Sequence, residues 1–221
     1  MRYMFTDKEI EELLNKMVVL VDTREQANDH VVEWLAKSKK NFKIKKLDYG
    51  DYSAMLPSGS FKGQTRDIYF TNDLAIERKF CIDELAMNLK DNKTNINEIT
   101  AEIIELLGEK YLQKVLKTDY NRLKCEFANM NRYEIEFYIL LEDKNFDENI
   151  RKGKYRSKYK PASLYKRLKG LESEFHTRIR PIDKEFMGSE IYNTLRYGVR
   201  NILIHEGYID DVELILEESI I

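Results

Sequence analysis

The 221-residue chain has the composition of a globular protein, with 43% hydrophobic and 34% charged residues and only nine Gly and three Pro. This composition excludes disordered and collagen-like chains, and the length suits one domain of ordinary size. The formal net charge of −2 argues against a protein coated with basic charge. Any site for nucleic acid must therefore be local.

Cysteines and histidines are too few and too scattered for a disulfide framework or a zinc site. The chain has two cysteines and three histidines, and none of them has the spacing of zinc ligands. The longest hydrophobic runs, residues 17–21 and 137–141, are five residues each, whereas a membrane-spanning helix needs about 20. The acidic N-terminus does not have the pattern of a signal peptide. We therefore expect a cytoplasmic protein without a membrane segment.

The first predicted elements are a short helix and a β-α-β unit. Thr6 and Glu9 have the spacing of a capping box, and the apolar residues that follow predict a helix within residues 1–17. The apolar run 18–21 predicts a buried strand that ends in charged residues. A helix capped at Asn28 or Asp29 follows. The next strand, from residue 42, is expected to continue through residues 50–55.

The rest of the chain continues to alternate strands and helices. The predicted elements are a hairpin of 68–70 with 74–80 turning at Asn72 and Asp73, a helix at 82–89, helices within 95–130, a strand at 135–141, a helix from Pro161 to Phe175, a strand at 177–182 and a helix at 191–202. This alternation predicts an α/β fold around a mixed sheet. The sequence shows no repeat and no Gly/Ser linker, which favours a single domain.

Glu77 and Lys79 lie two residues apart on a predicted strand, so their side chains point to one side of the sheet. If Asp51 lies on the neighbouring strand, two carboxylates meet where a hard cation such as Mg²⁺ takes oxygen ligands and keeps several waters. Lys79 could then orient a metal-bound water, as in metal-assisted phosphodiester hydrolysis. The pattern is weak alone, because exposed E-x-K triplets are common in a chain rich in Glu and Lys.

Three motifs that occur in order resemble the nuclease signature of the XPF-type structure-specific endonuclease family, a branch of the PD-(D/E)xK superfamily. They are Val21-Asp22-Thr23-Arg24-Glu25, Gly50-Asp51-Tyr52, and Glu77-Arg78-Lys79 followed by Asp83. The resemblance continues to Asn121-Arg122-Leu123 and covers about residues 18–201. It implies a restriction-endonuclease-like fold, a mixed central sheet flanked by helices.

The resemblance also implies roles for the residues of these motifs. The metal ligands would be Asp22, Asp51 and Glu77, with Mg²⁺ as the cation and Mn²⁺ as a substitute, and Lys79 would act on the attacking water. Supporting roles for the site or the substrate fall to Arg24, Glu25, Arg78, Asp83 and Arg122. Read without the family, residues 22–25 could form only a surface ion network, and Arg78 is as well suited to a structural ion pair as to a DNA contact.

Cellular members of this family usually carry a tandem helix-hairpin-helix module after the nuclease domain, and this chain shows no such repeat. It resembles the stand-alone versions of bacterial and phage genomes, so we expect it in a bacterial or phage-infected cell. The layout is then one nuclease domain over 1–221: an N-terminal helix at 1–17, a catalytic core at 18–90, an inserted helical region at 95–130, and the rest of the core at 134–205.

The DNA contacts must then come from another part of the chain. Nine cations lie between residues 151 and 169 without one acidic residue, and three tyrosines are interleaved with them. Such a run is often a solvated face, but phosphate contacts and aromatic stacking are what DNA binding needs. The candidate DNA-binding residues are Lys154, Arg156, Lys158, Lys160, Lys166 and Arg167.

The leading hypothesis is a Mg²⁺-dependent DNA endonuclease that cuts near branches or flaps. The resemblance also implies a homodimer, for which apolar residues between 99 and 107 offer an additional face. One alternative is a catalytically silent DNA-binding scaffold subunit, a role in which the acidic site residues are lost. Another is a restriction enzyme or exonuclease of the same fold.

Overall fold

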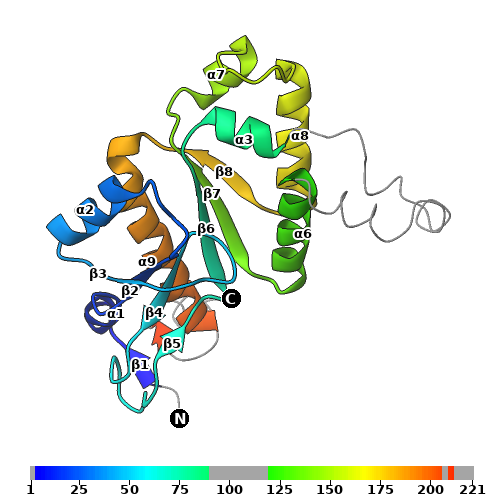
Figure 1. The fold of residues 1–221 in the computed structure, drawn as a ribbon. Coiled ribbons are helices and arrows are strands. Elements are labelled where there is room, and N and C mark those ends of the chain that lie inside the picture. The colour runs from blue at the N-terminus through cyan, green and yellow to red at the C-terminus, as the bar shows by residue number, and fades with distance from the viewer. Residues whose placement is uncertain (1–2, 90–118, 206–208, 212–221) are drawn as a thin grey trace, which may run out of the picture. The chain divides into compact units, whose positions relative to one another are not determined.

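The computed structural model describes residues 3–89, 119–205 and 209–211 (Figure 1), and the contacts gather in two compact units. The first unit is Met1–Glu77 with Lys184–Ile221, and the second is Arg78–Asp183. The boundary falls inside strand β6 (Leu74–Lys79). No Pro-, Gly- or Ser-rich linker marks it, so the sequence carried no signal for this division.

The first unit contains a mixed sheet with the strand order β3-β2-β4-β6. Strand β2 (Val18–Val21) is parallel to β3 (Asn41–Ile44) and antiparallel to β4 (Tyr52–Leu56). β4 is in turn antiparallel to β6, with Tyr52 opposite Ile76. All five residues of β4 are buried, as expected for a central strand.

Helices pack around this sheet. α1 (Asp7–Leu14) has the predicted capping box between Thr6 and Glu9, which is confirmed. α2 (Asp29–Lys37) packs on α9 (Met187–His205), which follows the short 3₁₀ helix Lys184–Phe186 and also packs on β4. Gly188 is required at the α2–α9 contact, because a Cβ atom there would lie 2.7 Å from the Trp34 side chain.

Two expectations for the first unit were wrong. The strand from residue 42 does not continue to residue 55, because the chain turns at Gly50 (φ +65°) and β3 and β4 run in opposite directions beside β2. Strand β5 (Ile68–Tyr69) does not pair with β6 as a hairpin. It pairs with β4 instead: Tyr69 lies opposite Met55, and the Phe70 N–H donates to the Ala54 carbonyl at 3.0 Å, so β4 takes the hydrogen bonds that a hairpin would have given to β6. A parallel pair of three-residue strands, β1 (Tyr3–Phe5) and β9 (Ile209–Asp211), was not predicted.

The second unit begins with the last two residues of β6 and contains two further strands. β7 (Glu136–Leu141) and β8 (Arg178–Pro181) are parallel. Its described residues form the helices α3 (Ile82–Asn88), α6 (Asp119–Arg132), α7 (Phe146–Lys152) and α8 (Pro161–Glu174), of which only α7 was not predicted. The predicted helices between residues 95 and 117 lie outside the described residues.

The fold class is therefore α/β, with a mixed central sheet flanked by helices. Among the described helices, none combines the length and the apolar character needed to span a bilayer.

A buried ion pair ties β6 to the end of β7 within the second unit. Arg78 Nη1 lies 3.0 Å from Glu142 Oε1, and the two side chains are 3% and 2% exposed. Beside it, the Glu142 N–H donates to the Lys79 carbonyl at 2.9 Å. Arg78 therefore has a structural ion-pair partner, whereas its role as a DNA contact stays a prediction.

Removal of one partner should destabilise the fold strongly, because it leaves the other charge buried without compensation. We expect Arg78→Met to lower the free energy of unfolding by about 3–5 kcal/mol, and Arg78→Met with Glu142→Leu to recover most of the loss. Urea unfolding followed by circular dichroism measures both effects. Arg132→Met, at an exposed arginine on α6, is the control. A loss below about 1 kcal/mol in Arg78→Met would contradict the structural role.

Candidate functional site

Asp22 is buried directly after β2, and its carboxylate accepts four hydrogen bonds. Oδ1 accepts from Arg24 N (2.7 Å) and Nε (2.8 Å), and Oδ2 accepts from Arg24 Nη2 (3.1 Å) and from Leu47 N (2.6 Å). Arg24 Nη2 also donates to the Leu47 carbonyl at 2.8 Å. The Asp22 and Arg24 side chains therefore join the loop after β2 to the connection between β3 and β4.

These contacts set the charge state of Asp22. Burial acts to raise the pKa of its carboxyl group, but the hydrogen bonds from Arg24 and from the Leu47 N–H outweigh burial and leave the pKa below its ordinary value. Asp22 is thus a stable carboxylate whose oxygen atoms are directed to protein donors. This arrangement favours a structural role, whereas its role as a metal ligand stays a prediction.

Asp51 is held next to β6 by its backbone. Its N–H donates to the Ile76 carbonyl at 2.8 Å, and its own carbonyl accepts from the Asp22 N–H at 2.8 Å. Gly50 allows this close approach, since a Cβ atom at Gly50 would lie 2.8 Å from the Ile76 carbonyl oxygen, and its φ of +65° is strained for other residues. The Gly50-Asp51-Tyr52 motif is therefore fastened to the residue that precedes Glu77.

Asp51 and Glu77 are both half-buried, and they are the two acidic residues that this backbone contact brings together in the first unit. No group of three His, Cys, Asp or Glu residues that could hold a metal ion occurs in the part of the chain that the structure describes. Mg²⁺ needs only one or two protein carboxylates, because it keeps several waters. Asp51 and Glu77 are therefore enough in number for a hard cation, and a metal site at these two residues stays a prediction.

Lys79 follows Glu77 on β6 and is nearly buried, with 8% of its side chain exposed. Its Nζ lies 3.4 Å from Glu84 Oε1 on α3. The other oxygen of Glu84 accepts from the Phe80 N–H at 2.9 Å, so Glu84 is anchored beside Lys79. Glu84 was not among the predicted site residues. Glu84 could have been predicted from its position, because it follows the Glu77-Arg78-Lys79 motif at the start of a predicted helix.

The remaining predicted site residues are Glu25 and Arg122. Glu25 is half-buried, and its N–H donates to the Asp22 carbonyl at 3.2 Å. Arg122 lies near the start of α6, and its side chain is outside the described part of the structure.

Asp83, the last residue of the third motif, anchors the basic segment. Its Oδ1 accepts from the backbone N–H of Arg156 (2.6 Å) and of Ser157 (3.3 Å), and its Oδ2 accepts from Arg156 Nε (3.0 Å). Burial raises the pKa of Asp83, but the hydrogen bonds from Arg156 prevail and lower it. Asp83 thus fixes the conformation of the loop between α7 and α8.

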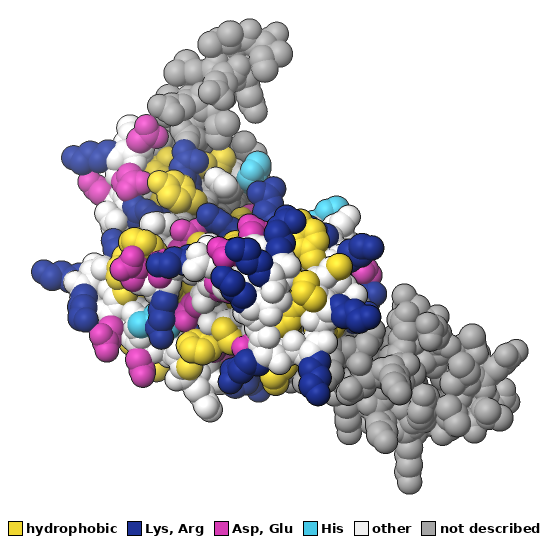
Figure 2. Space-filling model, turned by 90° about the horizontal axis from the view of Figure 1, so that it is seen from above, with side chains coloured by type: hydrophobic (Ala, Val, Ile, Leu, Met, Phe, Trp, Pro, Cys, Tyr) yellow, Lys and Arg dark blue, Asp and Glu magenta, His cyan; other side chains and the backbone are white. Residues whose placement is uncertain are grey.

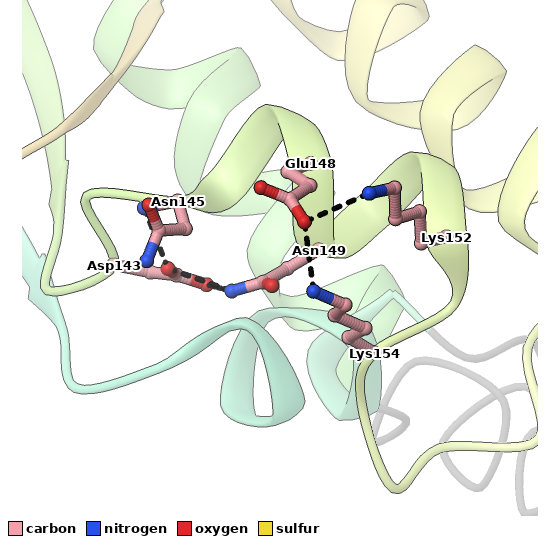
Figure 3. A network of polar contacts seen from close by, with 6 residues as sticks. All are labelled: Asp143, Asn145, Glu148, Asn149, Lys152 and Lys154. Atoms are coloured by element: carbon pink, nitrogen blue, oxygen red, sulfur yellow. Dashed lines mark hydrogen bonds and ion pairs between the residues drawn. The ribbon is translucent and has the colours of Figure 1, made fainter.

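Some of the cations in residues 151–169 bind acidic side chains or carbonyl groups, and others form no ion pair within the described residues. Lys152 and Lys154 both bind Glu148 Oε1, at 3.0 and 2.7 Å (Figure 3). Arg156 binds Asp83, and Arg167 Nη1 donates to the Leu89 carbonyl at 3.0 Å. Three exposed lysines have no ion pair within the described residues: Lys158, Lys160 and Lys166.

The tyrosines of this segment hold its conformation. Tyr155 is half-buried, its hydroxyl donates to the Tyr159 carbonyl at 2.8 Å, and burial raises its pKa. Tyr165 lies under the Arg151 guanidinium, 5.0 Å from the ring centroid. The three tyrosines predicted for base stacking therefore have intramolecular contacts, and Tyr159 accepts one of them.

Figure 2 shows Lys and Arg side chains over the visible face with Asp and Glu side chains among them. This mixture agrees with the formal net charge of −2. DNA affinity must therefore depend on particular cations that have no acidic partner.

The depressed pKa of Asp22 predicts a pH-dependent contribution to stability. A carboxylate with a folded-state pKa below its ordinary value of 3.8 stabilises the fold above that pH, and the contribution is lost as the pH falls through the folded-state pKa. We expect Asp22→Asn to lower the free energy of unfolding by about 1.5–3 kcal/mol at pH 7, and the difference from wild type to shrink in acid.

Urea unfolding of both proteins at pH 7 and in acid, each with EDTA present, measures this difference. Asp48→Asn, at an exposed carboxylate, is the matched control and should change stability by less than about 0.5 kcal/mol. A difference that persists unchanged in acid would contradict the role of the Asp22 charge.

Comparisons with known proteins identify the family of this chain. The ERCC4 domain family matches residues 21–187, more than half of the chain. Two solved structures, XPF from Aeropyrum pernix and the same protein in complex with DNA, are similar with 19% and 17% identity and TM-scores of 0.48 and 0.45. Each similarity covers 83% of this chain but only 62% and 66% of those chains. A search of curated proteins found no match. On the family match, the chain belongs to the ERCC4 domain family.

Proposed function

We propose that this protein is a DNA endonuclease that hydrolyses phosphodiester bonds with the help of Mg²⁺ or Mn²⁺. The observation that carries the proposal is the hydrogen bond from Asp51 N–H to the Ile76 carbonyl, which places one motif acid beside the strand that carries the other, Glu77. Membership of the ERCC4 domain family supports it. The DNA complex of XPF from Aeropyrum pernix suggests DNA as the substrate.

Each residue of the motifs has a distinct task in this proposal. Asp51 and Glu77 hold the cation through carboxylate oxygens, while Asp22 and Arg24 support the loop beside Asp51. A bound cation supplies an acidified water and neutralises charge that develops on the phosphate. Lys79 donates a hydrogen bond to the attacking water, and Glu84 keeps its ammonium group in position.

The preferred substrates in this proposal are branched or flap-containing DNA, and the protein acts as a homodimer. Both features come from the family resemblance, and light scattering would test the dimer. The apolar residues between 99 and 107 that were expected at its interface lie outside the described residues.

A catalytically silent scaffold is the second candidate function. It is disfavoured because Asp51, Glu77 and Lys79 are all present and the first two are brought together by the backbone. Flap, blunt linear and closed circular DNA, compared side by side, also separate a structure-specific endonuclease from a restriction enzyme or an exonuclease.

Loss of either carboxylate should abolish cleavage and preserve the fold. We expect Asp51→Asn and Glu77→Gln each to lower the rate of flap cleavage by about 100-fold or more, because each removes a charged ligand with little change in shape. Cleavage of a labelled flap in Mg²⁺ and in Mn²⁺ measures the rate, and circular dichroism checks the fold. Asp48→Asn should cut like wild type. A folded variant that retains wild-type cleavage would refute the metal site.

Cations without acidic partners should dominate DNA binding by the segment 151–169. Replacing Lys158, Lys160 and Lys166 with Gln should lower the slope of log affinity against log salt by up to about 0.9 per lost phosphate contact. Lys152→Gln with Lys154→Gln should have less effect, because both lysines already bind Glu148. Fluorescence anisotropy with duplex DNA in EDTA measures the slopes. A wild-type slope in the triple variant would exclude this segment from the DNA site.

A further inference from the structure

A second acid-free run of cations lies in the first unit, and the proposed site does not use it. Six lysines occur between residues 37 and 46 without an acidic residue among them. The run covers the end of α2 and all of β3. β3 is the terminal strand in the sheet order of the described residues, with β2 as its neighbour. Lys43 lies on this edge strand, Lys40 precedes it, and Lys45 and Lys46 follow it.

The edge strand begins at a cleft of about 830 Å³. Three lysines line this cleft, Lys16, Lys40 and Lys43, together with Asn15, Phe42 and Ser60. Lys16 Nζ donates to the Ser60 carbonyl at 2.8 Å, so one ammonium group is fixed at the wall of the cleft. The rest of the lining combines the apolar residues Val18 and Pro57 with Asn41, Ser58 and Gly59. The three ammonium groups make this cleft attractive to phosphate groups.

The strand leads from this cleft to the candidate site. In the parallel pairing, Asn41 lies beside Val18 at the cleft and Ile44 lies beside Val21, the residue before Asp22. Four residues of strand span roughly 13 Å. Lys45 and Lys46 follow at the far end, where the Lys45 N–H donates to the Val21 carbonyl at 2.9 Å. Cations thus accompany β3 from the cleft to the loop that supports Asp51.

In the part of the chain that the structure describes, no carboxylate neutralises the charges of these lysines. Within the described residues, none of Lys16, Lys40, Lys43, Lys45 and Lys46 forms an ion pair. Lys40 lies 4.5 Å from the ring centroid of Tyr192, and Lys45 lies 3.9 Å from that of Tyr69. An aromatic ring orients an ammonium group but does not cancel its charge.

We propose that Lys16, Lys40, Lys43, Lys45 and Lys46, here called the lysine track, bind the phosphate backbone of a single DNA strand along β3 and guide it between the cleft and the Asp51–Glu77 site. The proposal rests on the proposed nuclease function and adds a binding path for its substrate. Phe42, half-buried at the cleft, offers one ring against which a base can stack.

The competing explanation is protection of the sheet edge. Lysines on edge strands prevent pairing with the edge of another molecule. This explanation predicts that neutralising the lysines promotes self-association and leaves DNA affinity unchanged. The lysine track predicts the opposite, so one pair of variants separates the two.

The test compares Lys43→Gln/Lys46→Gln with Lys8→Gln/Lys37→Gln, which removes the same charge from exposed helix positions where each lysine pairs with a glutamate. Anisotropy with a labelled single-stranded oligonucleotide in EDTA reports affinity. We expect the track variant to lose about 25-fold in affinity at 0.1 M salt and its salt slope to fall by about 1.4, from two contacts of about 0.7 each. The control should match wild type.

A second measurement does not depend on substitution. Acetylation of wild-type protein followed by mass spectrometry should show that the oligonucleotide protects Lys43 and Lys46 and leaves Lys8 and Lys37 reactive. Equal affinity and slope in both variants, or equal protection of all four lysines, would overturn the proposal. So would self-association of the track variant with unchanged affinity, or a loss confined to duplex DNA. Because binding is measured without metal, a protein that binds but never cuts would refute the nuclease function alone.

Discussion

The hydrogen bond between the Asp51 N–H and the Ile76 carbonyl is the constraint on which the candidate site depends. It requires two backbones to approach so closely that only glycine can precede Asp51, because any Cβ at Gly50 would contact the same carbonyl at 2.8 Å. Asp22 adds a second restraint, since its N–H holds the Asp51 carbonyl while its carboxylate holds Arg24 and Leu47. Hydrogen bonds therefore join the motif that contains Asp22 to the motif that contains Asp51.

The charged residues of the three motifs differ in how deeply they are buried. Asp22 is buried and accepts four hydrogen bonds, so its charge stabilises a loop. Arg78 and Glu142 likewise neutralise each other in the interior of the second unit. Asp51 and Glu77 are only half-buried. Partial exposure suits ligands of a hydrated cation, because Mg²⁺ keeps several of its waters.

Much of the fold could be predicted from the sequence, but the pairing of the strands could not, and the roles of Asp51 and Glu77 stay predictions. The runs at β2 and β7 are strongly apolar, so burial was enough to predict these two strands, as the capping box was enough to predict the start of α1. Strand partners depend on where the chain turns, and the positive φ of Gly50 reversed one expected strand. The Glu84 contact to Lys79 and the Asp83 contacts to Arg156 were not predicted, since they join residues through tertiary geometry that no spacing rule contains.

Local cation counts in the sequence also overestimate the positive charge available to DNA. In the longest basic run, Lys152 and Lys154 form ion pairs with Glu148, and Arg156 forms one with Asp83. The shorter run on β3 contains no acidic residue and, within the described part of the chain, forms no ion pair along its lysine track. The field at a phosphate depends on unpaired charge within about one Debye length, near 8 Å at physiological salt. Ranking basic segments by their unpaired ammonium groups is therefore physically sounder than ranking them by length.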